Sequence, residues 1–282
     1  MPSLLKAATK QFLRRYKVRP HENGMRAVFL GDSVSNRVIL DGLFERFFLL
    51  ALDRQVFSKM PKDAVALDIG ANIGNHACFM ANRFAKVIAF EPNPIVFHVL
   101  MANTLGRNVD CLNLGLSNQT AQLPLVVKFP NYGLAHIALE GETPDITVDV
   151  QPLDSLAQAL HLDRVDFIKL DVDGHEIEVL EGALGVISRF RPIIALEAMY
   201  KLDPALGDRT LGFLEGAGYH YFYEFTPAPG LPARLAATGL SAQSNPLRYI
   251  FPESARKSVA LRQVPTLRGR DNELAVLSAT PL

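Results

Sequence analysis

The chain is poor in cysteine, carries no net charge and contains no long apolar run. Its two cysteines, Cys78 and Cys111, are too few for a disulfide framework, so a reduced intracellular compartment is expected. No Cys-x-x-Cys pair is present, which argues against structural zinc. A formal net charge of zero over 282 residues excludes a polycationic protein that binds nucleic acid through its overall charge.

Segments that could enter or cross a membrane are also missing. No stretch of about 18 apolar residues exists, so no membrane-spanning helix is expected. The most apolar stretch, residues 42–52, contains Glu45 and Arg46 and is too short to span. The first residues lack the apolar segment and the small-residue cleavage site of a secretory signal. The sequence therefore predicts a cytoplasmic protein.

The zero net charge hides a basic extension at each end of an acidic body. Residues 1–20 hold six basic residues and no acid, whereas residues 21–253 hold 18 basic and 27 acidic residues. Apolar residues recur every fourth position in residues 4–16, beside a basic face, which predicts a cationic amphipathic helix. Two alternatives stay open for residues 1–19: packing on the body, or contact with an anionic membrane surface.

From residue 64 onward, short apolar runs alternate with helix-like stretches. Strands are predicted at residues 65–68, 87–91, 109–112, 165–171, 193–197 and 219–223, and helices at 75–84, 95–105, 153–160, 176–188 and 210–217. This alternation predicts an α/β fold, with a mostly parallel sheet that carries helices on both faces.

Other segments depart from this alternation. A short strand is expected at 26–30, a helix at 42–59, and an inserted hairpin with loops at 123–150. A late strand is expected at 247–251. Periodicity is weak after Pro252, so residues 253–282 are predicted to form a basic, partly disordered tail. The predicted organisation is an N-terminal helical extension (1–60), a central domain (61–252) and this tail (253–282).

The first motif with chemical content is Val-Ala-Leu-Asp-Ile-Gly-Ala-Asn-Ile-Gly at residues 65–74, a strand followed by a glycine-rich turn. Its glycines let the backbone pass close to a ligand. The dinucleotide fingerprint requires glycine at position 72, where Asn72 stands, so pyrophosphate is disfavoured. A nucleoside ligand without pyrophosphate, such as S-adenosylmethionine, fits better; a plain strand–helix turn is the alternative. The candidate binding residues are Asp68, Gly70, Asn72 and Gly74.

The second motif places Glu91 at the end of the next predicted strand. Glu91 follows Gly70 by 21 residues, close to the spacing of about 20 for an acid that binds ribose hydroxyls. A carboxylate can accept hydrogen bonds from both vicinal hydroxyls at once. Glu91 is therefore predicted to bind the cofactor ribose, with a solvated strand end as the alternative.

A third segment, residues 168–182, carries several ionisable side chains. Asp171 falls at the carboxyl end of a predicted strand, where open α/β sheets bind ligands. Asp173 and Glu176 fit a helix capping box, and His175 belongs either to the helix surface or to the site. Glu197 ends the following strand, either as a buried carboxylate bonded to backbone or as a partner of Asp171 around an acceptor or a divalent cation.

These segments resemble the FkbM family of S-adenosylmethionine-dependent methyltransferases. The resemblance is carried by residues 68–74, Phe90-Glu91-Pro92, Leu116-Ser117-Asn118 and, above all, Ile168-Lys-Leu-Asp-Val-Asp-Gly-His-Glu176 with Leu180-Glu-Gly182. It covers about residues 64–225. It implies a Rossmann-like class I methyltransferase sheet, which makes 61–252 a methyltransferase domain, and methyl transfer to oxygen, commonly on sugars or glycosylated products.

Methyl transfer from a sulfonium is an in-line displacement, so the enzyme must align the acceptor, exclude water and manage the acceptor proton. A hydroxyl is a weak nucleophile, which calls for a base or a metal. Asp171 is the first candidate base and also belongs to the cofactor site, because it faces the expected methyl position. His175 is the second candidate, and Glu197 completes the catalytic set. The acceptor is expected to lie under residues 128–145 and 198–209.

The predicted function is S-adenosylmethionine-dependent O-methylation of a hydroxyl on a sugar, a glycan or a small natural product. The expected partner is that acceptor, and no nucleic-acid partner is expected. Whether a divalent cation takes part, and what the oligomeric state is, are left open. Two alternatives remain. One is a non-catalytic module that binds a nucleoside cofactor, and the other is an NAD(P)-dependent oxidoreductase, which Asn72 disfavours.

Overall fold

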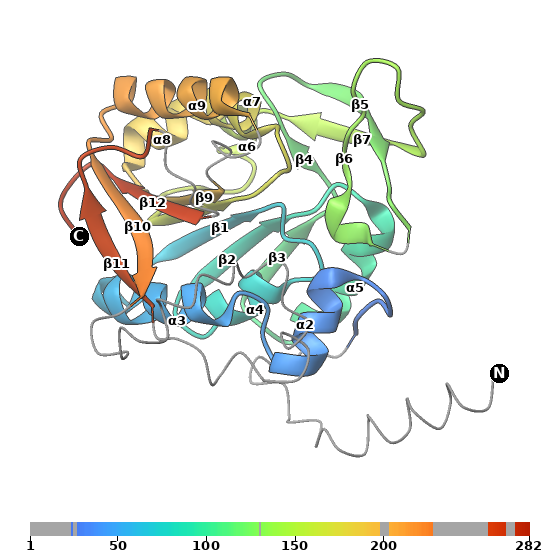
Figure 1. Cartoon of the computed structure of the whole chain (residues 1–282), viewed down its shortest axis with the longest axis horizontal. Helices are drawn as coiled ribbons and strands as arrows, with labels where there is room; N and C mark the ends of the chain where they lie inside the picture. The colour runs from blue at the N-terminus through green and yellow to red at the C-terminus, as the bar shows by residue number, and fades with distance from the viewer. Residues whose placement is uncertain (1–23, 25–26, 130, 198–202, 228–258, 269–273) are drawn as a thin grey trace, which may run out of the picture.

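A computed structural model describes residues 24, 27–129, 131–197, 203–227, 259–268 and 274–282. Its centre is an eight-stranded sheet with the order β11-β10-β12-β9-β8-β1-β2-β3 (Figure 1). The parallel strands are β1 (Val65–Ile69), β2 (Lys86–Phe90), β3 (Val109–Leu112), β8 (Phe167–Leu170) and β9 (Ile193–Glu197). Antiparallel pairing then adds β12 (Leu274–Ser278), β10 (Tyr221–Pro227) and β11 (Val259–Val264).

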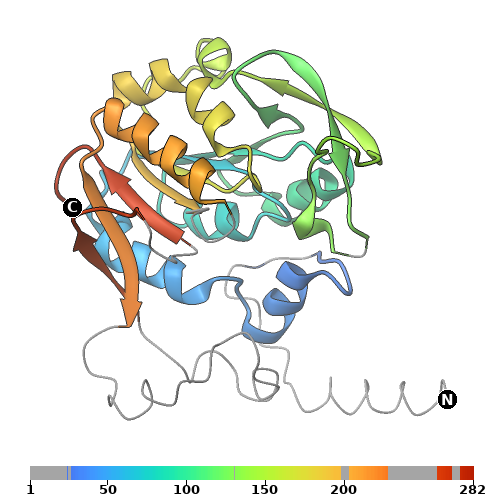
Figure 2. The same ribbon diagram turned by 45° about the horizontal axis from the view of Figure 1, so that its top comes forward.

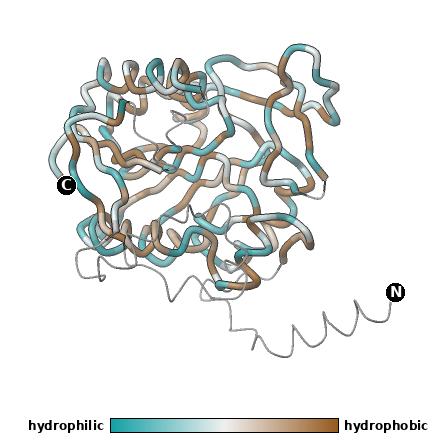
Figure 3. Tube along the Cα trace, viewed as in Figure 1, coloured by the Kyte–Doolittle hydropathy of each residue, from teal (hydrophilic) through white to brown (hydrophobic). Residues whose placement is uncertain are grey.

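The parallel strands β1, β2 and β8 are short, largely apolar runs (Figure 3), and nearly all of their residues are buried, as a sheet with helical crossovers requires. Side chains alternate between the two faces. In β1, Leu67 and Ile69 belong to one hydrophobic core, and Ala66 belongs to the other. The same alternation places Lys169 beside Asp68, its partner in register.

Helices cover both faces of the large sheet, which confirms the predicted α/β architecture (Figure 1). One layer holds α6 (Leu153–Leu156), α7 (Glu176–Glu181), α8 (Leu184–Phe190) and α9 (Pro204–Gly216). The other holds α3 (Arg46–Gln55), α4 (Asn75–Met80) and α5 (Pro94–Thr104), with α2 (Ser33–Asp41) beside it and the short η1 (Phe57–Lys59) after α3. Within the part of the chain that the structure describes, no helix is long and apolar enough to cross a membrane.

The helix predicted at 176–188 is two helices, α7 and α8, with a break after Glu181. Gly182 lies against the backbone of Ser117, and a Cβ at this glycine would come within 1.9 Å of the Ser117 oxygen. The Asp154 carboxylate accepts hydrogen bonds from the backbone N–H groups of Gly185 and Val186, at 2.7 and 2.8 Å. The apolar periodicity continues across the break, which is why the sequence pattern did not show it.

The inserted segment forms a second sheet with the order β4-β7-β5-β6, which confirms the predicted hairpin with loops. Its strands are β4 (Gly115–Leu116), β5 (Ala121–Val126), β6 (His136–Ile137) and β7 (Ile146–Gln151), with the short η2 (Tyr132–Leu134) between β5 and β6. Leu125, Val148 and Val150 are the buried residues of its own core. Figures 1 and 2 show this small sheet at the end of the molecule opposite β10, β11 and β12.

The predicted tail contributes two strands to the large sheet, at residues 259–264 and 274–278, which its weak periodicity did not indicate. β12 pairs with β9 and β10, and β11 pairs with β10. Backbone hydrogen bonds to neighbouring strands hold these two segments in the sheet, and no periodic pattern of apolar side chains specifies them.

The N-terminal region also differs from prediction. Residues 27–29 form no strand. Instead, Asp32 accepts a hydrogen bond from the Ser35 N–H at 2.7 Å and begins the helix α2. The helix expected at 4–16 and the strand expected at 247–251 lie outside the described residues.

Candidate active site

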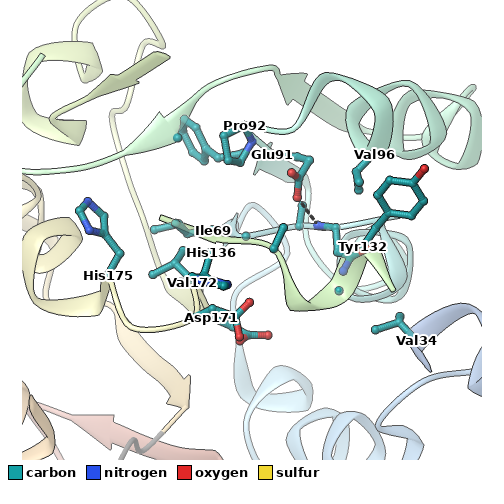
Figure 4. A pocket seen from close by; sticks show the side chains of 18 of the residues that line it. Val34, Ile69, Glu91, Pro92, Val96, Tyr132, His136, Asp171, Val172 and His175 are labelled. Atoms are coloured by element: carbon teal, nitrogen blue, oxygen red, sulfur yellow. Dashed lines mark hydrogen bonds between the residues drawn. The ribbon is translucent and has the colours of Figure 1, made fainter. Parts of the chain in front are cut away.

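A pocket of about 490 Å³ lies at the carboxyl ends of β1, β2, β8 and β9 (Figure 4). Residues 69–72, 90–92, 171–173 and Glu197 line it from these strand ends. The small sheet and the α2–α3 segment complete its wall through residues 132–137, Ser33, Val34, Phe44 and Glu45. Open α/β sheets bind ligands at this edge, so the pocket is the candidate active site.

The loop after β1 lies directly against the end of β8. Gly70 has a φ of 76°, and a Cβ at this position would lie 1.9 Å from the backbone oxygen of Asp171. Only glycine allows that approach. Asn72 is also left-handed, with a φ of 50°, and its side-chain oxygen accepts from the Ile73 N–H at 2.7 Å. Gly70 and Asn72 both line the pocket; their contact with a cofactor stays a prediction.

Glu91 follows β2 directly and is 8% exposed. Its carboxylate accepts hydrogen bonds from the backbone N–H groups of Asn72 at 2.9 Å (Figure 4) and Asn93 at 2.8 Å. Burial raises the pKa of Glu91 to about 7, against the opposing effect of these two donors. The carboxylate is therefore fixed on the pocket wall, and each oxygen keeps a lone pair for one further hydrogen bond.

Two predicted cofactor residues are not on the pocket wall. Asp68 is fully buried, with Oδ1 3.6 Å from Nζ of Lys169. Gly74 precedes α4 with a φ of 89°, and a Cβ there would lie 2.8 Å from a methyl carbon of Leu100. Asp68 and Gly74 thus lie behind the loop that follows β1, and their direct contact with a ligand stays a prediction.

Lys169 is a site residue that the sequence reasoning missed. It is 5% exposed, and its Nζ lies 2.8 Å from the Gly70 carbonyl oxygen and 3.1 Å from Oδ2 of Asp171. Burial would lower the pKa of Lys169, but the Asp171 and Asp68 carboxylates outweigh it and raise this pKa above its usual range. A lysine inside an apolar strand, two positions before Asp171, was the available signal.

The positive charge of Lys169 determines the protonation state of Asp171. Burial alone would raise the pKa of Asp171, but the neighbouring ammonium more than offsets it and lowers this pKa. Asp171 is therefore ionised at neutral pH, as a hydrogen-bond acceptor and a weak base.

Glu197 lies beside Asp171, and the two side chains share a hydrogen bond. Burial, together with the nearby carboxylates of Asp171, Asp173 and Glu176, raises the pKa of Glu197 to about 8. Near neutral pH the protonated Glu197 donates to the Asp171 carboxylate. The structure thus brings these two predicted site residues together; what they bind stays a prediction.

His175 lines the pocket, but its ring is turned away from the Asp171 carboxylate (Figure 4). The His175 Nε2 lies 3.0 Å from Oγ of Ser117, and burial lowers the pKa of the imidazole. Nearby, the Asn118 side chain donates to Oε2 of Glu181 at 2.7 Å. The segments 116–118 and 168–182 therefore pack against each other beside the pocket.

The predicted capping box of Asp173 and Glu176 is wrong. α7 begins at Glu176, so His175 is its N-cap residue, and Asp173 lies in the preceding loop with a φ of 50°. Oε1 of Glu176 accepts from the backbone N–H groups of Val172 and Gly174, at 3.2 and 3.3 Å. The Glu176 carboxylate thus holds the backbone of this loop, and Asp173 lines the pocket.

The wall formed by the N-terminal helices was not expected from the sequence. Oδ2 of Asp32 accepts a hydrogen bond from the Gly133 N–H at 3.1 Å, which joins the start of α2 to the small sheet. Glu45 Oε2 lies 3.0 Å from Nε2 of His76, and both residues line the pocket. No motif marks these residues, and their contacts span 31 residues or more.

One of the two segments expected over the acceptor lines the pocket, through residues 132–137. In the other, residues 203–209 do not line it, and 198–202 lie outside the described residues. Among the described side chains, no group of three or more His, Cys, Asp or Glu is placed to hold a metal ion.

A family comparison decides which fold family this site belongs to. The model of the methyltransferase FkbM domain matches residues 68–221, more than half of the chain. The chain belongs to the FkbM methyltransferase family. Its large sheet is accordingly a Rossmann-like class I methyltransferase sheet, and the resemblance seen in the sequence is confirmed.

Individual FkbM relatives match only part of their own length. The hexuronic acid methyltransferase AglP of Haloferax volcanii is 30% identical, over 54% of this chain and 62% of that protein. Methyltransferase sdnD of Sordaria araneosa is 32% identical, over 44% of this chain and 62% of that protein. The chain thus spans about three fifths of these curated relatives. Among solved structures, the FkbM methyltransferase of Methylobacillus flagellatus is 24% identical over 62% of this chain and 41% of that chain, with a TM-score of 0.41.

FkbM membership implies S-adenosylmethionine as the methyl donor, and the residues present fit that group. Glu91 offers a fixed carboxylate with free lone pairs for vicinal hydroxyls. The ionised Asp171 carboxylate adds negative charge to a pocket that would receive a sulfonium cation. Family membership also argues against the oxidoreductase alternative.

Proposed function

We propose that this FkbM protein transfers a methyl group from S-adenosylmethionine to a hydroxyl oxygen of a sugar, a glycan or a small natural product. The carrying observation is the pair of fixed carboxylates, Glu91 and Asp171, on opposite sides of one pocket (Figure 4). A relative with 30% identity, named a hexuronic acid methyltransferase, supports a sugar as the acceptor.

In this proposal Glu91 binds the ribose hydroxyls of the cofactor. The loop of Gly70 and Asn72 borders the cofactor, and Asp68 and Gly74 hold that loop in place. Bound S-adenosylmethionine supplies an electrophilic methyl group. Because the small sheet and the α2–α3 segment also wall the pocket, they exclude water from the reacting groups.

Asp171 would accept a hydrogen bond from the acceptor and hold it in line with the methyl. Its contacts with Lys169 and Glu197 fix its orientation before the acceptor arrives. Alignment of this kind supplies a large part of the rate of a two-substrate reaction. His175, held by Ser117, is the second candidate for contact with the acceptor.

The test is methyl transfer from S-adenosylmethionine labelled in its methyl group, with neutral sugars, hexuronic acids and glycosides as acceptors. Mass spectrometry of the product locates the methyl. We expect an O-methylated product, formed at least about 10²-fold more slowly by Asp171→Asn, because a misaligned acceptor reacts that much less often. The variant should retain its affinity for S-adenosylhomocysteine.

Three other outcomes of these assays would each change the proposed function or the role of a residue in it. Binding of S-adenosylhomocysteine without transfer to any acceptor would favour the non-catalytic module. Near wild-type turnover by Asp171→Asn would remove Asp171 from the site. Turnover lost with a chelator and restored by magnesium would show that a divalent cation takes part, since carboxylate oxygens suit such cations.

A further inference from the structure

A second pair of polar side chains, Glu45 and His76, lies on the pocket wall. Oε2 of Glu45 lies 3.0 Å from Nε2 of His76, and the side chains are 20% and 11% exposed. Both residues line the pocket. Glu45 lies outside the residues that the family model matches, and His76 follows the glycine-rich loop.

The backbone around this pair is clamped in place. The Asn75 side chain accepts from the Phe44 N–H and donates to the Phe44 carbonyl oxygen, both at 3.0 Å. It thereby ties the residue before Glu45 to the residue before His76. Glu45 itself has a φ of 53°, a conformation that a side-chain-bearing residue keeps only where its surroundings impose it. Such second contacts orient functional groups in a site.

The other candidate proton acceptors in the pocket are less suitable. Asp171 is held ionised by Lys169, which makes it a weak base, and Glu197 already carries a proton near neutral pH. His175 is turned toward Ser117. A second imidazole–carboxylate pair, His136 with Glu142, lies on the small sheet, where the glutamate is 36% exposed.

We propose that His76, oriented by Glu45, is the general base that removes the proton of the reacting hydroxyl. This inference rests on the proposed function. With Nε2–H donating to Glu45, the lone pair is on Nδ1. As the acceptor oxygen bonds to the methyl carbon, the carbon–sulfur bond breaks, its electron pair stays on sulfur, and the hydroxyl proton moves to Nδ1. Glu45 stabilises the resulting imidazolium, as the carboxylate of a catalytic triad does.

The variant that tests this proposal is His76→Gln, and Glu45→Gln is measured in parallel. A glutamine amide can still donate a hydrogen bond to Glu45 but cannot take up a proton, so this change separates a base from a structural contact. We expect kcat to fall by about 10²–10⁴-fold in His76→Gln, the usual contribution of general base catalysis. Glu45→Gln should lower kcat in the same direction by less. The KM for S-adenosylmethionine and the affinity for S-adenosylhomocysteine should stay close to wild type in both.

Chemical rescue provides the second readout. Added imidazole should restore turnover to His76→Ala in proportion to its concentration, and should not accelerate the surface control His98→Gln. Wild-type kcat in folded His76→Gln overturns the inference, and so does a fall in S-adenosylhomocysteine affinity that accounts for the whole loss of activity. Absence of methyl transfer by the wild type is a different result, since it contradicts the proposed function itself.

Discussion

Lys169 sets the charge balance of the pocket at the scale of single residues. Its ammonium contacts the Gly70 carbonyl oxygen and the Asp171 carboxylate, with Asp68 at 3.6 Å. One buried cation thus joins the loop after β1 to the end of β8. A buried lysine is tolerated there because two carboxylates and a carbonyl oxygen compensate its desolvation.

Glu91 yields a prediction about pH. Because burial raises its pKa to about 7, its ionised fraction increases steeply from about pH 6 to 8. An ionised carboxylate accepts the stronger hydrogen bonds from ribose hydroxyls. Affinity for S-adenosylhomocysteine, measured by calorimetry, should therefore rise with pH through about 7 and then level off.

The variant to compare with the wild type in this measurement is Glu91→Gln. Loss of a charge-assisted hydrogen bond of about 1.5–3 kcal/mol should weaken binding by roughly 10–150-fold and remove the step near pH 7. Asp173 and Glu197 titrate in both proteins, so the difference between the two curves reports Glu91. Equal affinities at every pH would remove Glu91 from the ribose site.

At the scale of elements, α3 lies against β11, one of the two edge strands of the large sheet. Gln55 accepts a hydrogen bond from the Leu261 N–H at 2.7 Å and donates to the Leu261 carbonyl oxygen at 3.4 Å. Its amide therefore pairs with β11 as a neighbouring strand would. Arg54 adds a hydrogen bond to the Val259 carbonyl oxygen at 3.3 Å. Edge strands left with unpaired backbone invite association with other chains.

Gln55→Ala should loosen β11. Two backbone hydrogen bonds are lost, at about 0.5–1.5 kcal/mol each, so the free energy of unfolding should fall by about 1–3 kcal/mol. Hydrogen exchange at the Leu261 amide should accelerate. In Arg54→Ala that amide keeps its partner, so its exchange should stay close to wild type. Unchanged exchange in Gln55→Ala would show that β10 alone holds the strand.

The elements differ in how far sequence could predict them. The parallel strands stood out because each is a short apolar run between helix-like stretches. β11 contains Arg262 and Gln263, which interrupt its apolar pattern, and β12 is a short apolar run without helix-like stretches on either side. Their place depends on pairing with β9 and β10, which no local pattern encodes.

At the scale of the whole molecule, the pocket combines parts that were predictable with parts that were not. Glu91 followed from its spacing after Gly70, and Asp171 from its place at a strand end. The contact between Glu45 and His76 depends on how the N-terminal helices fold back over the sheet edge, which tertiary packing decides. Asp68 was placed in the cofactor site by its motif, yet the fold buries it behind the wall.

Both proposed roles, for Asp171 and for His76, require that this pocket binds S-adenosylmethionine. Thermal unfolding with S-adenosylhomocysteine at about 100 times its Kd tests it, because that occupancy adds roughly 2.7 kcal/mol of stability. At roughly 2–4 °C per kcal/mol, Tm should rise by about 5–11 °C. NAD+ should produce no rise, and Glu91→Ala should show a smaller one with S-adenosylhomocysteine at the same concentration. Stabilisation by NAD+ but not by S-adenosylhomocysteine would contradict the account.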